Sequence, residues 1–409
     1  MTRESNRHSM SDPAGRLNIA LQRSGSGLNC RIDSTRPVTA ARVFTSRTPL
    51  EVAGLIPMLF SICARAQSCA GVTALEQALG QPAPPAVDLA RRRSVLVERL
   101  REHLWRILLD WPPLVGADPE RETMQEVVRQ AKTLCAALDP DGTLFRPDGT
   151  SGRSDRARMD QAVDQLDTLV AERVFGMSAA DWLHEIDRRA ALGDWAGSAR
   201  TGAARLLHAL ALDGTGALGQ SPVAPLPELA DAELIAAMSG PAADDFVARP
   251  TWGGEPYETS PFARQSGAPL LLDLAPSLGN GILPRLAAQL REVALALVEL
   301  RAEPESTSRT ETPLPPGGGG VGGEGGGIGL GRAEAARGRL AHLARVADGR
   351  VREYRILAPT EWNCHPHGIL ARGLAGLPSA DERLLERSAQ LLVISTDPCV
   401  AYTLTISPT

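Results

Sequence analysis

Segments with leucine at helical spacing run through the chain and restrict the folds open to it. In the clearest one, Leu96, Leu100, Leu104 and Leu108 recur every four residues, and Pro112 ends the pattern. Further helices are predicted at Arg158–Phe175, Leu283–Leu300 and Ala380–Ile394, and at Leu50–Gly80 with a bend at Pro57. At 409 residues with 43% hydrophobic content, the chain can bury a complete core. The sequence therefore predicts a mainly α-helical protein.

Short β-prone and flexible segments interrupt these helices. Strands are predicted at Leu17–Leu21 and Leu28–Ile32, and a hairpin at Leu340–Thr360 around Asp348-Gly349. A Pro/Gly-rich tract at 301–329 predicts a flexible linker, and residues 1–15 are predicted to be disordered. The parts at 16–300 and 330–409 are interpreted as one domain. GxGxxG matches inside the tract follow no strand, so they do not indicate a dinucleotide-binding loop.

The charge and hydropathy patterns exclude several classes of partner. Acidic and basic residues are mixed throughout and the net charge is −5, which argues against nucleic acid binding. No apolar run reaches the roughly 18 residues of a membrane helix, and the polar N-terminus lacks the apolar block of a secretion signal. A cytoplasmic protein without membrane contact is predicted.

Six cysteines are scattered over the chain, which favours free thiols or metal ligands over a disulfide framework. Cys63 and Cys69 would lie about 120° apart on a helix. Taken locally, that geometry favours two inert buried cysteines over a shared metal. Cys364, His365 and His367 form either a loop with incidental histidines or a second metal site.

Five ordered segments resemble the large subunit of [NiFe] hydrogenases. They are SICARA around Cys63, ETSPFAR at Glu258–Arg264, GLGRAEAARGRLAH at Gly329–His342, DGRVREYRILAPTEWN at Asp348–Asn363 and DPCVAYTLT at Asp397–Thr405. In order, they are similar to the family's RxCGxC, ExGPLAR, GxGxxEAPRGxLxH, a hairpin ending in PTTWN, and DPCxxCxxH. Residues 80–250 do not match. The resemblance implies a large-subunit-like fold, mainly α with small β-sheets and hairpins, whose two chain ends meet in the core.

The departures from the family pattern lie at the nickel ligands. In the family, two CxxC motifs supply four thiolates to nickel, and the second cysteine of each pair also bridges to iron. Here Cys63 and Cys399 match the first cysteines, whereas Ala66 and Tyr402 occupy the bridging positions. Nickel favours soft thiolates in a defined geometry, and a bridge needs a sulfur that touches both metals. The resemblance therefore implies neither stable nickel nor catalysis.

The side of the site that would surround iron is retained. The family's iron carries two cyanides and one carbon monoxide, and a buried cyanide needs strong hydrogen-bond donors. Arg337 matches the arginine that donates to a cyanide, Pro359 and Thr360 match the pair that lines the cyanide pocket, and Asp397 matches the acidic residue beside the arginine. The resemblance implies that Cys63 and Cys399 transiently hold an Fe(CN)2CO fragment or an iron precursor.

This combination is similar to the HupK (HoxV) family of hydrogenase maturation proteins, which REHLWRILLDWPP at Arg101–Pro113 also resembles. The resemblance implies a non-catalytic scaffold or metallochaperone for the Fe(CN)2CO centre. Its partners would be the hydrogenase large-subunit precursor and HypC/HypD-type maturation proteins.

Other interpretations of the same residues stay open. The chain could be a metal-free large-subunit mimic that serves as an interaction module, or a divergent hydrogenase. Cys63 and Cys399 could be core remnants of a lost enzyme, and Arg337 could pair with Glu334 or Asp397. Glu258 and Arg264 are expected to make fold contacts rather than to touch a metal, and His103 and His342 are expected to be structural.

Overall fold

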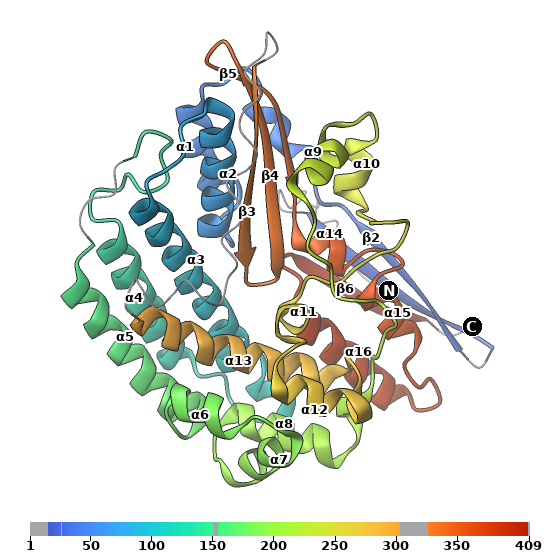
Figure 1. Ribbon diagram of the computed structural model, residues 1–409. Helices are drawn as coiled ribbons and strands as arrows, with labels where there is room; N and C mark the ends of the chain where they lie inside the picture. Colours follow the sequence, from blue (N-terminus) through green and yellow to red (C-terminus); the bar gives the residue numbers. More distant parts are fainter. Residues whose placement is uncertain (1–14, 26, 150–153, 303–325, 408–409) are drawn as a thin grey trace, which may run out of the picture.

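The computed structural model describes residues 15–25, 27–149, 154–302 and 326–407. Helices make up most of these residues, and two three-stranded sheets complete the fold (Figure 1). The prediction of a mainly α-helical protein with small sheets is confirmed. None of the described helices combines the length and apolar character needed to cross a membrane.

Most of the helices lie between two groups of strands along the chain. The strands are β1 (Arg16–Ser24), β2 (Gly27–Ser34), β3 (Gly327–Ala335), β4 (Gly338–Ala347), β5 (Arg350–Leu357) and β6 (Ala401–Ser407). The helices are α1 (Pro49–Leu59), α2 (Ala64–Leu79), α3 (Pro85–Trp105), α4 (Arg121–Leu138), α5 (Arg156–Val170), α6 (Ala179–Glu185), α7 (Arg189–Ser198), α8 (Gly202–Leu212), α9 (Asp231–Ser239), α10 (Ala243–Ala248), α11 (Pro261–Gln265), α12 (Pro269–Leu278), α13 (Ile282–Arg301), α14 (Pro359–Asn363), α15 (Ile369–Ala375) and α16 (Glu382–Thr396). Short helical turns are η1 (Ala40–Phe44), η2 (Arg106–Asp110), η3 (Pro112–Val115), η4 (Ala171–Phe175) and η5 (Thr215–Ala217).

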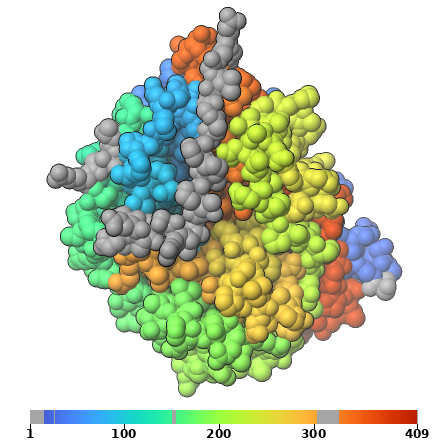
Figure 2. Space-filling model, in the orientation of Figure 1, coloured from blue at the N-terminus to red at the C-terminus, as the bar shows by residue number. Residues whose placement is uncertain are grey.

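The first sheet brings the two chain ends together. Its strand order is β2-β1-β6, with β1 antiparallel to β2 and parallel to β6. Leu17, Ile19 and Leu21 alternate along β1 on the buried face, as a half-buried strand requires. Figure 2 shows the β1–β2 hairpin in blue beside the red C-terminal residues. The predicted meeting of the chain ends in the core is therefore confirmed.

The second sheet is an antiparallel meander of β3, β4 and β5. Asp348 and Gly349 join β4 to β5 and both have positive φ angles, 53° and 68°, as a two-residue type I′ turn requires. The predicted hairpin is confirmed. The predicted linker, however, reached residue 329, whereas β3 begins at Gly327. Residues 303–325 of that linker and residues 1–14 of the predicted disordered end lie outside the described residues.

Alternate glycines allow β3 to lie directly on the backbone of α2. A Cβ atom added at Gly327, Gly329 or Gly331 would come within 1.9–2.0 Å of a carbonyl oxygen of α2. Glycine in a strand commonly marks such a close approach of two backbones. The same glycines weaken the strand signal in the sequence, which is why β3 was not predicted.

Gly331→Ala is expected to lower the free energy of unfolding by about 1–3 kcal/mol, because the new methyl group overlaps the Ala70 carbonyl oxygen. Urea denaturation measures the change. The matched control is Gly193→Ala in α7, where an added Cβ meets no atom within 4 Å. Removing a helical glycine there should keep or raise stability, by up to about 1 kcal/mol. Equal effects of the two substitutions would contradict the close packing of β3 on α2.

Helix α13 is the centre of the helical core and is buried around most of its circumference. It packs against α3, α6, α11, α12 and α16. The predicted leucine row of α3 and η2, from Leu96 to Leu108, is buried in the same core. Figure 1 shows α13 crossing the middle of the molecule between the helical layer and the two sheets.

The predicted helix at Leu50–Gly80 consists of two helices, and the expected bend at Pro57 is wrong. Pro57 lies in the last turn of α1, and the amide of Phe60 still donates to the Ile56 carbonyl at 3.1 Å. A proline is tolerated there because the helix ends within one turn. The break falls between Leu59 and Ala64, so Cys63 is the N-cap residue of α2. Its side chain therefore projects from a helix start and not from a helix face.

Candidate functional site

The residues predicted for the site come from separate parts of the chain and meet where the two sheets approach the helical core. Cys63 precedes α2, and Arg337 lies in the two-residue turn between β3 and β4. Pro359 and Thr360 begin α14. Asp397 and Cys399 lie between α16 and β6. Hydrogen bonds and ion pairs connect the Arg337 turn, the start of α14 and the segment after α16.

The Cys399 sulfur lies between a hydroxyl group and a guanidinium group. Thr360 Oγ1 is 2.9 Å from Cys399 Sγ, and Arg36 Nη1 donates to the same sulfur at 2.9 Å. Arg36 Nε also forms an ion pair with Glu361 Oε1 at 2.8 Å. Burial alone would lower the pKa of Arg36, but the negative charges of Glu361 and Cys399 raise it. Arg36 therefore stays a cation beside the sulfur.

The Cys63 sulfur accepts a hydrogen bond from its own helix, α2. Gln67 Nε2 donates to Cys63 Sγ at 3.5 Å. Burial raises the pKa of the Cys63 thiol to about 12, and the charges of Cys399 and Glu98 act in the same direction. The effect of Cys399 on the pKa of Cys63 indicates that the two thiols lie in the same region of the fold, although they are far apart in the sequence.

Arg337 is buried and faces two carboxylates. Its Nη1 lies 2.6 Å from Glu102 Oε2, and its Nε lies 3.0 Å from Asp397 Oδ2. A third contact joins its Nη2 to Asp397 Oδ1 at 3.3 Å. A guanidinium carries five N–H groups, so at least two remain for another acceptor. Of the two ion pairs left open by the sequence, the one with Asp397 forms, whereas Glu334 pairs with Arg264 and Arg339.

The turn that carries Arg337 is held by its neighbours. Arg264 donates to the carbonyl oxygens of Ala335 and Ala336 at 3.1 and 3.2 Å. Asn363 Nδ2 donates to the Arg337 carbonyl at 2.8 Å. As predicted, Arg264 makes a fold contact, and its effect is to fix the backbone from which the Arg337 side chain projects.

Glu258 likewise makes a fold contact. It is fully buried and forms an ion pair with Arg285 of α13. This pair connects the segment before α11 to the central helix.

A row of charged residues on α3 and η2 lines the site and was missed in the sequence. Glu98, Glu102, Arg106 and Asp110 follow one another at intervals of four, so they share one side of the helix. Glu102 pairs with Arg337, while Arg106 pairs with Asp397 at 2.6 Å and with Asp110 at 2.7 Å. The four-residue spacing was visible in the sequence, but it also fits a solvated helix face.

Asp397 lies between two guanidinium groups, those of Arg337 and Arg106. Burial alone would raise the pKa of Asp397, but the charges of these two arginines lower it below its ordinary value. Asp397 has a left-handed backbone, with φ of 55°, directly after α16. A negative charge is thus fixed two residues before Cys399.

Glu98 caps the start of α2. Its carboxylate accepts hydrogen bonds from the amides of Arg65 and Ala66 at 2.7 and 3.1 Å. Cys63, the N-cap residue, makes no such side-chain hydrogen bond. The amide at Ala66, the position of a bridging cysteine in the catalytic family, is therefore engaged by a protein carboxylate.

The burial of Glu98 is expected to make the free energy of unfolding depend on pH. Burial raises the pKa of Glu98 from 4.5 to about 7, although the two amide hydrogen bonds oppose this shift. Folding therefore favours the protonated form of Glu98. Its contribution to the free energy of unfolding is complete below pH 4.5 and is lost as the pH rises through 7. At about 1.4 kcal/mol per pH unit, the loss is about 3 kcal/mol.

Glu98→Gln is expected to remove this loss. Urea denaturation from pH 4.5 to 8 should show that the stability difference between variant and parent changes by about 2–3 kcal/mol across that range. Glu126→Gln serves as the control, because Glu126 is a half-buried glutamate of α4 whose pKa is lowered by hydrogen bonds from Arg129 and Gln130. Parallel stability curves for Glu98→Gln and the parent would contradict the raised pKa.

The other cysteines and histidines considered as metal ligands are Cys69, Cys364, His365 and His367. Cys69 is buried inside α2, and Cys364 is buried at the end of α14. His365 Nδ1 accepts a hydrogen bond from the His367 amide. Within the described ranges, no three or more His, Cys, Asp or Glu side chains are grouped to hold a metal ion.

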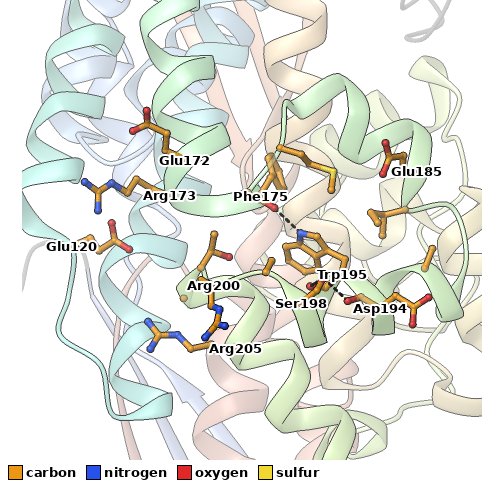
Figure 3. A pocket seen from close by; sticks show the side chains of 17 residues that line it. Glu120, Glu172, Arg173, Phe175, Glu185, Asp194, Trp195, Ser198, Arg200 and Arg205 are labelled. Atoms are coloured by element: carbon orange, nitrogen blue, oxygen red, sulfur yellow. Dashed lines mark hydrogen bonds between the residues drawn. The ribbon is translucent and has the colours of Figure 1, made fainter.

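An open pocket of about 830 Å³ lies apart from these residues, among η4, α6, α7 and α8 (Figure 3). Its lining includes Arg173, Arg200 and Arg205 together with Glu120 and Trp195. None of the predicted site residues lines it. The pocket belongs to the part of the chain in which the sequence showed no motif.

Comparison with known proteins relates the chain to two groups. The family described as nickel-dependent hydrogenase matches residues 324–404. The hydrogenase expression/formation protein HoxV of Cupriavidus necator is 31% identical over 382 residues, which cover 91% of each chain. HupK of Rhizobium leguminosarum bv. viciae, which carries the same description, is 31% identical over 92% of each chain. HupV of Azotobacter chroococcum is 28% identical over 95% of this chain and 98% of its own.

Solved hydrogenase structures share the fold. The Ni-Fe-Se hydrogenase of Desulfomicrobium baculatum superposes with a TM-score of 0.58 at 14% identity, covering 93% of this chain and 95% of its own. An NAD+-reducing [NiFe]-hydrogenase gives a TM-score of 0.57 at 17% identity, covering 91% and 93%. At these identities the likeness concerns the fold alone. It confirms the predicted large-subunit-like architecture.

Proposed function

Because the chain belongs to the HoxV/HupK family of hydrogenase expression/formation proteins, we propose that it is a non-catalytic scaffold for the iron centre of a [NiFe] hydrogenase. The cargo would be an Fe(CN)2CO fragment or an iron precursor, held between Cys63 and Cys399. One observation carries the proposal: Cys399 lies against Thr360 and Arg36, and the buried Arg337 pairs with Asp397, two residues before Cys399.

The donors around the two sulfurs suit a cargo with anionic diatomic ligands. A buried cyanide is costly unless strong donors satisfy it. Arg337 keeps at least two N–H groups beyond its carboxylate contacts, and the Thr360 hydroxyl group can donate as well as accept. Pro359 fixes the start of α14 and thereby the position of Thr360.

The two positions that would bridge to a second metal now serve the fold. The Ala66 amide donates to Glu98, and the Ala66 side chain is fully buried. Tyr402 lies in β6 opposite Leu17 and packs against the main core. Two sulfurs without bridging partners can hold a single iron but cannot complete a nickel–iron core. This arrangement supports a carrier that releases its cargo.

The proposed partners follow from the cargo. An Fe(CN)2CO fragment has to be received from the proteins that build it, the HypC/HypD-type maturation proteins, and passed to the large-subunit precursor. The likeness between this fold and the large subunit would allow both to bind the same maturation factors. The transfer is proposed to take place in the cytoplasm.

A second candidate function is a metal-free interaction module, and one surface feature favours it. Met58, Leu59, Ile62 and Trp105 are 76, 48, 43 and 45% exposed. Arg101 donates to the Ile62 carbonyl at 3.3 Å, which ties the segment before Cys63 to the turn of α3 that ends at Trp105. Exposed apolar side chains close together commonly mark a protein interaction site.

Anaerobic purification from a host that makes the whole maturation pathway tests the proposal, with infrared spectroscopy and metal analysis as readouts. A carrier shows cyanide and carbonyl bands with bound iron and without nickel. Absence of bands and iron, with maturation proteins co-purifying, favours the interaction module. Tightly bound nickel with hydrogen uptake would identify a divergent hydrogenase.

A further inference from the structure

A buried chain of hydrogen bonds leads from Tyr354 to the Cys63 sulfur. Tyr354 OH lies 2.8 Å from His342 Nδ1, His342 Nε2 lies 2.7 Å from Gln67 Oε1, and Gln67 Nε2 lies 3.5 Å from Cys63 Sγ. Tyr354, His342 and Gln67 are all at most 3% exposed. The chain thus crosses from β5 through β4 to α2 without reaching solvent.

The groups in the chain allow two consistent directions of donation. In the first, Tyr354 O–H donates to His342 Nδ1, His342 Nε2–H donates to the Gln67 oxygen, and the Gln67 amide donates to sulfur. In the second, all three bonds are reversed, and the thiol of Cys63 donates to a flipped Gln67 amide. Burial lowers the pKa of His342 to about 3, so the ring is neutral and carries one N–H in either case.

Tyr354 selects the first direction. Within the described residues its hydroxyl group makes no other hydrogen bond than the one to His342. In the reversed direction the hydroxyl hydrogen would be buried without an acceptor, which typically costs about 1–3 kcal/mol. In the first direction the Tyr354 O–H, the His342 N–H and one Gln67 N–H all have acceptors, and the donor that loses its acceptor relative to the reversed direction is only the weak S–H group of Cys63.

Close packing surrounds the hydrogen-bonded side chains of Tyr354 and His342. Gly71 lies one helical turn after Gln67 on α2, and a Cβ added there would come within 2.8 Å of Tyr354 OH and 3.2 Å of His342 Nδ1. The ring of Tyr354 also packs edge-on against Phe44, with centroids 4.8 Å apart. The hydroxyl group and the imidazole are therefore fixed in position as well as in hydrogen bonding.

We infer that Tyr354 and His342 are positioning residues that act through Gln67, holding its amide so that an N–H group points at the Cys63 sulfur. A sulfur that accepts such a hydrogen bond is prepared to act as a metal ligand, as outer partners prepare ligands in other metal sites. This role at the metal rests on the proposed function. The direction of the hydrogen bonds does not depend on the proposed function.

The direction can be measured on the metal-free full chain by NMR of the histidine ring nitrogens, with His342 assigned by its absence in His342→Gln. The inference predicts the neutral Nε2–H tautomer. In Gln67→Leu the Nε2–H loses its acceptor, so the population should move toward the Nδ1–H tautomer, which can donate to the Tyr354 oxygen. Gln77→Leu, also on α2, should leave the tautomer unchanged, because Gln77 bonds to the Leu330 amide instead. An Nδ1–H tautomer in the parent protein would overturn the inference.

The effect on the metal is measured on protein carrying the iron fragment. Loss of a hydrogen bond to sulfur makes the sulfur a stronger electron donor, so Gln67→Leu should lower the carbonyl stretching frequency. Tyr354→Phe, a milder change, should lower it less, and Gln77→Leu should not move it. Unmoved bands in folded Gln67→Leu would overturn the positioning role while leaving the scaffold proposal intact. Absence of bands in the parent would remove the scaffold proposal and leave the tautomer result standing.

Discussion

Arg337→Met is expected to lower the free energy of unfolding by about 3–5 kcal/mol. The substitution keeps the length of the side chain but leaves Asp397 and Glu102 without the cation that they share. Removing one partner of a buried ion pair has this cost because the other partner stays buried and charged. Asp397 keeps its pair with Arg106 and Glu102 keeps its pair with Arg101, so the loss should lie at the lower end of this range. Urea denaturation at neutral pH measures the loss.

Arg339→Met provides the matched control. Arg339 lies two residues further along β4 and pairs with Glu228, but both side chains are substantially exposed, at 34 and 69%. Exposed ion pairs contribute about 1 kcal/mol or less. Adding Asp397→Asn to Arg337→Met should recover part of the lost stability. A loss below 1 kcal/mol for Arg337→Met alone would contradict the account of a buried, charge-balanced site.

Cys63→Ala and Cys399→Ala are each expected to abolish the cyanide and carbonyl bands of protein purified with its maturation pathway. Each substitution removes one of the two proposed sulfur ligands. Loss of an outer-shell partner alone typically weakens metal binding by about 10–100-fold, so loss of a sulfur ligand should leave little iron bound. Infrared spectra and iron content of the variants give the result.

Two other cysteines serve as controls for these variants. Cys30 lies in β2 and pairs with Leu21, so Cys30→Ala should keep the bands. Cys364 is buried, and its pKa is raised by burial and then by the charge of Cys399, which places it near the site. Cys364→Ala should also keep the bands. Their disappearance in Cys364→Ala would mean that a third sulfur takes part.

Much of the fold was predictable because the informative signals are local or ordered along the chain. Leucine spacing predicted the helices, and Asp348-Gly349 predicted the β4–β5 turn. The order of the five motifs predicted that the segment of Cys63 and the segment of Cys399 belong to one structure. The resemblance also implied that the two chain ends meet, and they do so through the pairing of β1 with β6.

Other parts depended on tertiary contacts that no local signal reveals. Strand β3 is rich in glycine, and only the backbone of α2 explains why. Helix α1 ends beyond Pro57, and this places Cys63 at a helix start.

Some site residues were not predicted for the same reason, because their roles depend on tertiary contacts. Arg36 follows β2 in a loop without any motif, and its role depends on Glu361 and Cys399, which lie far away in the sequence. Glu98, Glu102 and Arg106 have the spacing of an ordinary solvated helix face. They line the site only because the Arg337 turn and the end of α16 pack against that face.

If Cys63 and Cys399 hold one iron that carries diatomic ligands, that iron has two sulfur neighbours. X-ray absorption at the iron K-edge of the anaerobically purified protein counts those sulfurs directly. The account predicts two sulfur atoms per iron, together with the short iron–carbon distances of bound cyanide and carbon monoxide. An iron shell with no sulfur, or with four sulfur atoms and no diatomic ligands, would contradict it.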